Sequence, residues 1–313
     1  MTNRVLAHTG VTYPIFQAPM GWIARAQLAS AVSEAGGLGI LETSSGETEA
    51  CKAEIAAMQK TTRKPFGVNL PLLFLKDDAM LRFVCTCGIK FVTTSAGSPA
   101  AFIKPLKEAG LIVYHVVPTV KAAIGAVAAG VDGLVVEGAE GGGFKNPDEV
   151  SSLVLLQGVR AAVDVPIVAA GGICDGRGMA AAFALGAEAV QMGTRFVSAA
   201  ESPVHENYKN AIVTGGVGDT IMLNRKTSPR MRALKTTASQ AQFEEGAIPK
   251  DAFKNIRKVY FDGDLEAAPA LAGQTIGLIG AVKPAKQIID ETVAEFFAIA
   301  ERMGGLGRAR SFG

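Results

Sequence analysis

Two glycine-containing turns within residues 166–197 have the composition of a phosphate-binding site. Gly171 and Gly172 end a short, β-branched apolar run. Gly193 and Thr194 end the next such run along the chain. Glycine turns at strand ends leave main-chain amides bare, and bare amides bind an anion without help from a basic side chain. A single pair could simply close a turn, but two consecutive pairs favour a phosphate site.

The sequence offers few side chains for metal, nucleophilic or acid–base chemistry. The three histidines, His8, His115 and His205, are far apart and none has a second ligand at helical spacing, so we expect no metal site. No serine lies in a nucleophile-elbow motif. The four cysteines are too irregularly spaced for a disulfide framework or a zinc site. A phosphate site of this kind is typical of a bound organic cofactor that brings its own reactivity.

The two turns belong to a regular alternation of strands and helices. Short apolar runs bounded by glycine or proline indicate buried strands, and segments with apolar residues at helical spacing separate them. Strands are expected at residues 14–19, 38–41, 65–69, 90–94, 111–117, 133–137, 166–170 and 189–192. Helices are expected between them, and residues 201–212 are expected to supply the last one.

This alternation predicts an α/β protein whose parallel strands close into a (β/α)8 TIM barrel. An open, doubly wound sheet is the alternative, but no GxGxxG motif follows the first strand, where a dinucleotide-binding fold would have one. We expect the barrel in residues 1–213 and a small helical excursion over the barrel top in residues 214–272. Residues 273–313 are expected to form a C-terminal segment whose helix packs back on the barrel.

In such a barrel the working residues follow the carboxyl ends of the strands, and the loops after strands seven and eight often bind phosphate. The two glycine turns are in those loops. His115 lies within the fifth strand and is expected to point towards the same face. The other candidates follow the remaining strand ends: Ala18, Pro19 and Met20 after the first strand, Asn69 after the third, Thr93 to Ser95 after the fourth, Glu137 to Phe144 with Gly142 after the sixth, and Gln191 and Met192 with the eighth.

Composition narrows the class of function. The 313 residues are 49% hydrophobic and 19% charged, which is enough to build a large core. The net charge of +2 is spread without blocks of one sign, so we expect no nucleic-acid partner. No apolar run reaches the ~18 residues of a membrane span, and the first residues lack an apolar signal region. We therefore expect a cytoplasmic protein with a small-molecule substrate and no membrane partner, and a homodimer is compatible with the sequence.

Five ordered sequence blocks resemble the nitronate monooxygenase family, formerly called 2-nitropropane dioxygenases. The related flavin-dependent enoyl-acyl-carrier-protein reductases share the same pattern. The blocks are PIFQAPMGW at 14–22, AGGLGIL at 35–41, KPFGVN at 64–69, AAGGICDGRG at 169–178 and QMGTRF at 191–196. The likeness extends over roughly residues 10–212, and the segment AGQTIGLI around Gly273 also fits.

The resemblance implies an FMN-containing barrel enzyme. It implies that the FMN phosphate contacts Gly171, Gly172, Gly193 and Thr194, with Gln191 and Met192 alongside. It also implies that the isoalloxazine ring packs near Ala18, Pro19 and Met20, with Asn69 bonding the polar edge of the ring and Gly142 in the loop above. A small Ala-Pro turn is compatible with close approach of a flat ring.

Phe144 is a departure from the family pattern, because both branches usually have a histidine at this position of the segment EGAEGGGFKN. Phenylalanine cannot transfer a proton, so the usual acid or base of the family is missing. Three residues are candidates to replace it. His115 lies on a strand and is either catalytic or a satisfied core residue. Glu140 is expected to fix the loop. Lys145 is expected to face solvent, with binding of a substrate phosphate or carboxylate as the alternative.

Three functions remain open at this point. The first is an FMN-dependent oxidoreductase that passes a hydride from NADH or NADPH through the flavin to the activated C=C bond of an enoyl thioester or enone. The run VVPTV at 116–120 is closer to the enoyl-reductase branch and favours this function. The second is a nitronate monooxygenase that oxidises alkyl nitronates with O2. The third is a flavin-binding protein whose activity decayed when the histidine was lost.

Overall fold

Eight parallel strands form a closed barrel in the computed structural model, which describes residues 3–75, 77–249 and 251–309. Residues 1–2, 76, 250 and 310–313 lie outside the described residues, although the domain ranges expected from the sequence include them. The strands are β1 (Ile15–Gln17), β2 (Gly39–Leu41), β3 (Phe66–Pro71), β4 (Phe91–Ser95), β5 (Ile112–Val117), β6 (Gly133–Glu137), β8 (Ile167–Ala170) and β9 (Ala189–Met192).

The order of the strands is β1-β9-β8-β6-β5-β4-β3-β2, and the two ends of this series meet. Phe16 and Leu38 form a parallel bridge between β1 and β2. Leu38 N donates to Ile15 O at 2.8 Å, and Gln17 N donates to Leu38 O at 2.9 Å. The predicted closed barrel is therefore confirmed, and the open doubly wound sheet is excluded.

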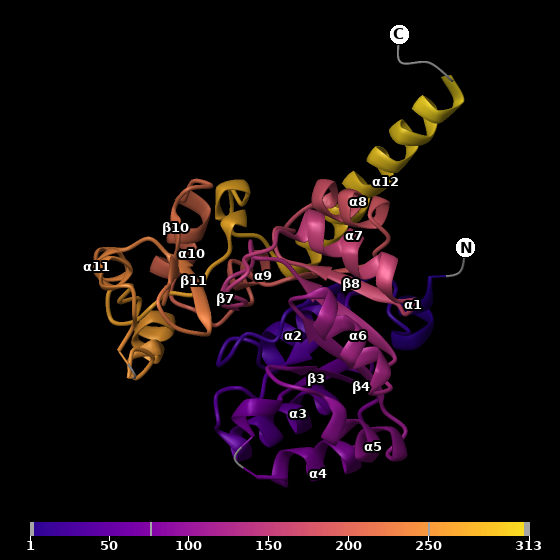
Figure 1. The fold of residues 1–313 in the computed structure, drawn as a ribbon, viewed down its shortest axis with the longest axis horizontal. Helices are drawn as coiled ribbons and strands as arrows, with labels where there is room; N and C mark the ends of the chain where they lie inside the picture. The colour runs from indigo at the N-terminus through magenta and orange to yellow at the C-terminus, as the bar shows by residue number, and fades with distance from the viewer. Residues whose placement is uncertain (1–2, 76, 250, 310–313) are drawn as a thin grey trace.

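Helices separate the strands and cover the outside of the barrel (Figure 1). Several helices have an N-cap residue whose side chain accepts a hydrogen bond from an amide of the first turn. Thr119 accepts from Ala122 N, and Asp175 accepts from Gly178 N. The helices are α2 (Ala26–Glu34), α3 (Thr48–Thr61), α4 (Ala79–Thr86), α5 (Ala100–Glu108), α6 (Val120–Ala128), α7 (Ser152–Ala162) and α8 (Gly176–Ala184). The short helix η1 (Leu72–Phe74) follows β3.

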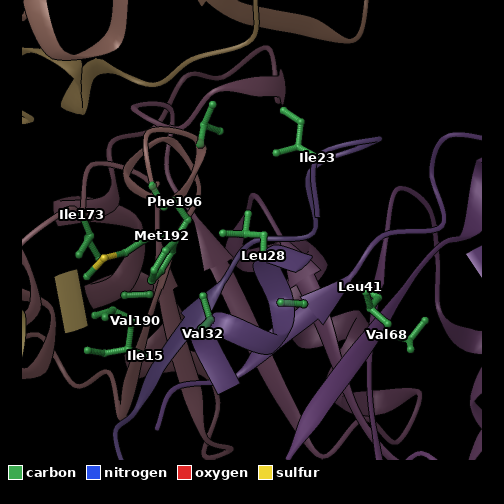
Figure 2. Packing of buried hydrophobic residues seen from close by; sticks show 14 of the residues in the cluster. Ile15, Ile23, Leu28, Val32, Leu41, Val68, Ile173, Val190, Met192 and Phe196 are labelled. Carbon is green, nitrogen blue, oxygen red and sulfur yellow. The ribbon is translucent and has the colours of Figure 1, made fainter. Parts of the chain in front are cut away.

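Two apolar layers hold the barrel together because successive strand residues face opposite sides. The interior contains Phe16, Phe91 and Tyr114, whose neighbouring rings lie 5.6 Å and 4.9 Å apart. The outer layer, between strands and helices, includes Ile15 and Val32 (Figure 2). Each large side chain fully buried in this way contributes about 1.5–3 kcal/mol of hydrophobic stabilisation.

Helix α1 (Arg4–Thr9) packs against the amino-terminal end of the barrel, opposite the expected site. Val5 belongs to the interior cluster. The Nδ1 atom of His8 lies 3.0 Å from the hydroxyl of Tyr114. His8 is therefore part of the barrel floor.

The last helix of the barrel is α12 (Ala285–Ala309), which packs against α8 and α2. The expectation that residues 201–212 supply this helix is wrong. The helix found there, α10 (Glu206–Thr214), packs against η3 (Gln274–Leu278) instead. A Cβ atom on Gly176 would lie 2.5 Å from Phe296 N, so the absence of a side chain lets α8 and α12 approach closely. Among the described residues, no helix has the length and apolar character needed to cross a bilayer.

The excursion between the barrel strands and α12 contains a small sheet as well as helices. Its strands are β10 (Thr220–Leu223) and β11 (Arg230–Leu234), followed by α11 (Thr237–Glu245) and η2 (Lys258–Asp262). The sequence predicts helices here but not the two strands, which have no clear local strand pattern. β11 also pairs with β7 (Gly143–Lys145), a strand in the loop after β6. The excursion is thus joined to the carboxyl end of the barrel through β7 (Figure 1).

Candidate active site at the carboxyl end of the barrel

The two glycine turns lie side by side at the carboxyl ends of β8 and β9. Ala170 pairs with Gln191 in the ladder, so the residues that follow them are neighbours. Gly171 and Gly172 have φ of 86° and 76°, which side chains rarely adopt. A Cβ atom on Gly171 would lie 2.8 Å from Gly138 O, so the loop after β6 packs directly on this turn. Only glycine fits this position without movement of the backbone.

Three polar groups at these turns have no partner among the residues that the structure describes. Among the described residues, none accepts a hydrogen bond from the main-chain amides of Gly172 or Thr194. Gln191 is buried, and within the described part of the chain its Oε1 atom has no partner. Unsatisfied buried polar groups are costly, and they commonly mark a place where another molecule binds. Bare amides beside an unsatisfied side-chain amide fit the phosphate and polar edge of a nucleotide cofactor.

The end of β1 borders the same turns. Ala18 N donates to Met192 O at 2.9 Å, which joins the ends of β1 and β9. A Cβ atom on Gly193 would approach only Ala18 Cβ, at 3.6 Å, and Met20 Sδ, at 3.7 Å. Ala18 and Met20 thus border this corner of the barrel end, and Pro19 lies between them in the chain.

Met192 does not present its side chain to the site. The side chain is buried in the outer layer, in the same cluster as Ile173 and Phe196 (Figure 2). Along β9, Ala189 faces the barrel interior, so the alternation that turns Gln191 inward turns Met192 outward. Met192 contributes its main chain alone to the end of the barrel.

Asn69 is buried at the end of β3, with its side chain fixed by two neighbours on β4. Thr93 Oγ1 donates to Asn69 Oδ1 at 2.9 Å. Asn69 Nδ2 donates to Ser95 Oγ at 3.2 Å. These bonds orient the amide, and the inward-facing hydroxyls of Thr93 and Ser95 add polar groups to the barrel mouth.

The loop after β6 is tied to the returning C-terminal segment. Gln274 N donates to Glu140 O, and Gly273 N donates to Thr194 Oγ1, both at 2.9 Å. A Cβ atom on Gly142 would lie 2.7 Å from the carbonyl carbon of Ala272. The Glu140 carboxylate accepts bonds from Ser152 N and Oγ at 2.9–3.0 Å, which confirms the expectation that it fixes this loop.

His115 faces the helices, so the expectation that it points towards the site is wrong. Tyr114 lies in the barrel interior, whereas Val113 and Val117 lie in the outer layer, on the same side of β5 as His115. His115 Nδ1 lies 2.8 Å from Thr94 Oγ1, also on the outward side. Burial lowers the pKa of His115 to about 4, which keeps the ring neutral near pH 7. The structure separates His115 from the other candidates.

Phe144 lies in β7 at the edge of the site, half-exposed, within an aromatic cluster. Its ring centroid is 6.0 Å from that of Phe74, in the helix after β3, and 6.0 Å from that of Phe253, in the excursion. Phe74 and Phe253 were missed in the sequence, because nothing in their local patterns indicates that distant segments meet. At the position where the family resemblance implies a histidine, this chain therefore has an apolar aromatic rim.

Lys145 is buried, so the expectation that it faces solvent is wrong. Its Nζ atom donates to Glu137 Oε1 at 2.5 Å and to Phe144 O at 3.0 Å. The Lys145 side chain is 3% exposed, and that of Glu137 is 28% exposed. Val135 faces the barrel interior, so Glu137, two residues later on β6, faces the interior as well. The sequence places Glu137 among the strand-end candidates, but no local pattern indicates its ion pair with Lys145.

The closed barrel, with its polar and glycine-rich carboxyl end, defines an enzyme of the (β/α)8 class. A family model described as nitronate monooxygenase matches residues 3–295, and the chain belongs to this family of oxidoreductases.

Three similar proteins illustrate the family. FabK of Thermotoga maritima superposes with a TM-score of 0.93 at 39% identity, over 98% of this chain and 99% of that chain. Nitronate monooxygenase of Pseudomonas aeruginosa is 33% identical over 68% of this chain and 74% of its own length. (3aS,4S,5R,7aS)-5-hydroxy-7a-methyl-1-oxo-octahydro-1H-indene-4-carboxyl-CoA dehydrogenase of Mycobacterium tuberculosis is 36% identical, and this match spans 72% of the chain but only 64% of the relative's length.

Proposed function

We propose that this protein is an FMN-dependent oxidoreductase that passes a hydride from NADH or NADPH to the activated C=C bond of an enoyl thioester or enone. The observation that carries the proposal is the chemistry of the barrel mouth. Amide and hydroxyl groups of Asn69, Thr93 and Ser95 line it, and Phe144 stands in the position of the family's histidine. A mouth of this kind suits hydride transfer better than removal of a proton from a neutral carbon acid.

The proposed FMN site uses the residues that the two turns bring together. Gly171, Gly172, Gly193 and Thr194 would hold the phosphate with main-chain amides, beside Gln191 and the main chain of Met192. Ala18, Pro19 and Met20 would border the ring, with Asn69 at its polar edge and Gly142 in the loop above. When bound, FMN supplies the hydride-accepting and hydride-donating chemistry that the side chains lack.

The protein's own contribution is binding, orientation and exclusion of water. Thr93 and Ser95 hold the Asn69 amide in one orientation before any ligand arrives, which lowers the cost of binding. The loop carrying Gly142 is held from two sides, by Ser152 and by the segment at Gly273. A loop fixed in this way covers the end of the barrel without having to become ordered first.

An apolar thioester is the substrate class that we favour. The rim formed by Phe74, Phe144 and Phe253 offers aromatic surface to an apolar acyl group. The Mycobacterium tuberculosis relative is named for a carboxyl-CoA thioester of a methylated ring system, which supports the same class.

Anaerobic turnover tests the proposal. The protein should oxidise NADH or NADPH in the absence of oxygen when an enoyl-CoA such as octenoyl-CoA is supplied, and the saturated thioester should accumulate in equal amount. Omission of the thioester is the control and should stop nucleotide oxidation after one equivalent of flavin is reduced. No thioester-dependent oxidation with either nucleotide would remove the reductase function.

A second candidate is a nitronate monooxygenase, favoured by the buried ammonium of Lys145 beside the mouth. An alkyl nitronate is already an anion, so it needs a cationic neighbour more than it needs a base. The Pseudomonas aeruginosa relative carries this name. Oxygen uptake on propionate 3-nitronate, with no uptake on the neutral nitroalkane and no reduction of the flavin by nicotinamides, would favour this function over the first.

A further inference from the structure

Lys145 and Glu137 form an ion pair that has no role in the proposed reductase function described above. An ammonium group in a protein interior is stable only when its N–H groups have hydrogen-bond acceptors and its charge is balanced. Two of the Lys145 N–H groups have acceptors, which are Glu137 Oε1 and Phe144 O. Among the residues that the structure describes, none accepts the third.

The pair lies at the proposed reaction site. Glu137 is paired with Ala170 in the ladder, and Ala170 is followed by the first glycine of the turn after β8. A Cβ atom on Gly141 would lie 2.7 Å from Glu137 Oε1 and 3.1 Å from Lys145 Nζ, so the loop after β6 lies directly against the pair. Lys145 also directly follows Phe144, the residue that replaces the family's histidine.

We infer that Lys145 is the acid that protonates the substrate, with Glu137 as its counter-ion and its route to solvent. This inference rests on the proposed reductase function. Reduction of the C=C bond adds a hydride to the β-carbon, supplied by the nicotinamide through the flavin, and a proton to the α-carbon. The π electrons of the C=C bond form the new α C–H bond with a proton from the Lys145 ammonium. The neutral amine then regains a proton from water through the more exposed Glu137 carboxylate.

Single-turnover kinetics of the holoenzyme test the assignment, because the two half-reactions place different demands on Lys145. In the first half-reaction, NADH or NADPH reduces the flavin, and the protein donates no proton. In the second, octenoyl-CoA reoxidises the enzyme without oxygen, and the protein must donate a proton to the thioester. Lys145→Met should therefore leave the first rate within about twofold and slow the second about 100-fold, within the usual range for a general acid.

Further variants separate proton donation from charge and from structure. Lys145→Arg keeps the positive charge but holds its proton much more tightly, so reoxidation should be slow in this variant too. Lys209 is the matched control: its side chain is 5% exposed and its Nζ donates to Ala200 O at 3.3 Å, away from the proposed site. Lys209→Met should reoxidise at the wild-type rate. FMN affinity and the far-ultraviolet circular dichroism spectrum should be unchanged in the Lys145 variants that fold.

The outcomes distinguish this inference from the proposed function. Wild-type enzyme that is not reduced by nicotinamides, or not reoxidised by the thioester, removes the function itself. If the wild type completes both half-reactions and Lys145→Met reoxidises equally fast, the inference is overturned and the function stands. Should Lys145→Met not fold, Glu137→Gln serves instead, and reoxidation should slow about tenfold or more. Wild-type reoxidation should also be slower in D2O, and an unchanged rate would overturn the inference without any variant.

Discussion

The main-chain N–H of Gly273 donates a buried hydrogen bond of 2.9 Å to Thr194 Oγ1. This bond joins the returning C-terminal segment to the turn after β9. Thr194→Val keeps the shape of the side chain but removes the acceptor and leaves the Gly273 amide unsatisfied. We expect the apoprotein to lose about 1–3 kcal/mol of unfolding free energy, measured by urea denaturation. Thr194→Ser keeps the hydroxyl and should lose clearly less. Equal stability of the valine and serine variants would contradict this role of the bond.

A matched pair of glycines tests the proposed phosphate site. Gly172 and Gly110 both have positive φ, 76° and 75°, so alanine at either position costs about 1–2 kcal/mol of backbone strain. A Cβ atom on Gly172 would lie 3.3 Å from Glu140 Cβ, whereas one on Gly110 would have no neighbour within 4 Å. We expect Gly172→Ala to weaken FMN binding about tenfold or more, equivalent to at least about 1.4 kcal/mol. Gly110→Ala should bind FMN normally, as measured by fluorescence titration of the apoproteins. Equal FMN affinities in the two variants would argue against the turn after β8 as the phosphate site.

His115 should make stability depend on pH without affecting catalysis. Its pKa is lowered to about 4 in the folded protein, against about 6.5 in the unfolded chain. The unfolded chain therefore takes up the proton first as the pH falls. The stability of the neutral, buried ring is complete above about pH 6.5 and is lost between about pH 6.5 and 4, by up to about 3 kcal/mol.

His115→Gln removes this titration, so the difference in unfolding free energy between wild type and variant should change over the same pH range. Denaturant titrations at pH 4, 5, 6 and 7 measure it. The steady-state rate of the variant at pH 7 should match the wild type, because the ring faces the helices. A loss of activity of about 100-fold or more without loss of folding would restore His115 as a catalytic candidate.

Much of the barrel could be predicted from the sequence because its signals are local. Each parallel strand is a short apolar run that ends in glycine, proline or a polar residue, and helical spacing follows. The last barrel helix could not be recognised in this way. Residues 201–212 are helical in composition and come next in the chain, but α12 occupies that place because the excursion is inserted before it. Nothing in a local pattern records such an insertion.

The errors in the site have a second physical cause. Neighbouring strand residues face opposite sides, so a residue in an apolar strand can be assigned to the wrong face without any change in the strand itself. This is why the sequence assigns His115 to the wrong face of β5. Lys145 was expected in solvent because a lone lysine is costly to bury. Its partner Glu137 becomes its neighbour only when β7 folds back over the barrel.

Phe144→His tests whether the aromatic rim has replaced an acid–base group. The new imidazole should allow proton abstraction from a neutral nitroalkane, with oxygen uptake rising about tenfold or more as the pH passes the usual histidine pKa of about 6.5. Phe144→Gln is the control, since it is polar and of similar length but cannot take up a proton. A gain of equal size in both variants would show that polarity, and not proton transfer, is responsible.

The most direct test of the central claim is the absorbance spectrum of the purified protein, recorded without oxygen before and after addition of NADH and then NADPH. The account predicts a yellow protein with the flavin spectrum, which bleaches with at least one of the two nucleotides and recovers on addition of an enoyl-CoA. A colourless protein that does not take up FMN, or a yellow one that stays oxidised with both nucleotides, would contradict it.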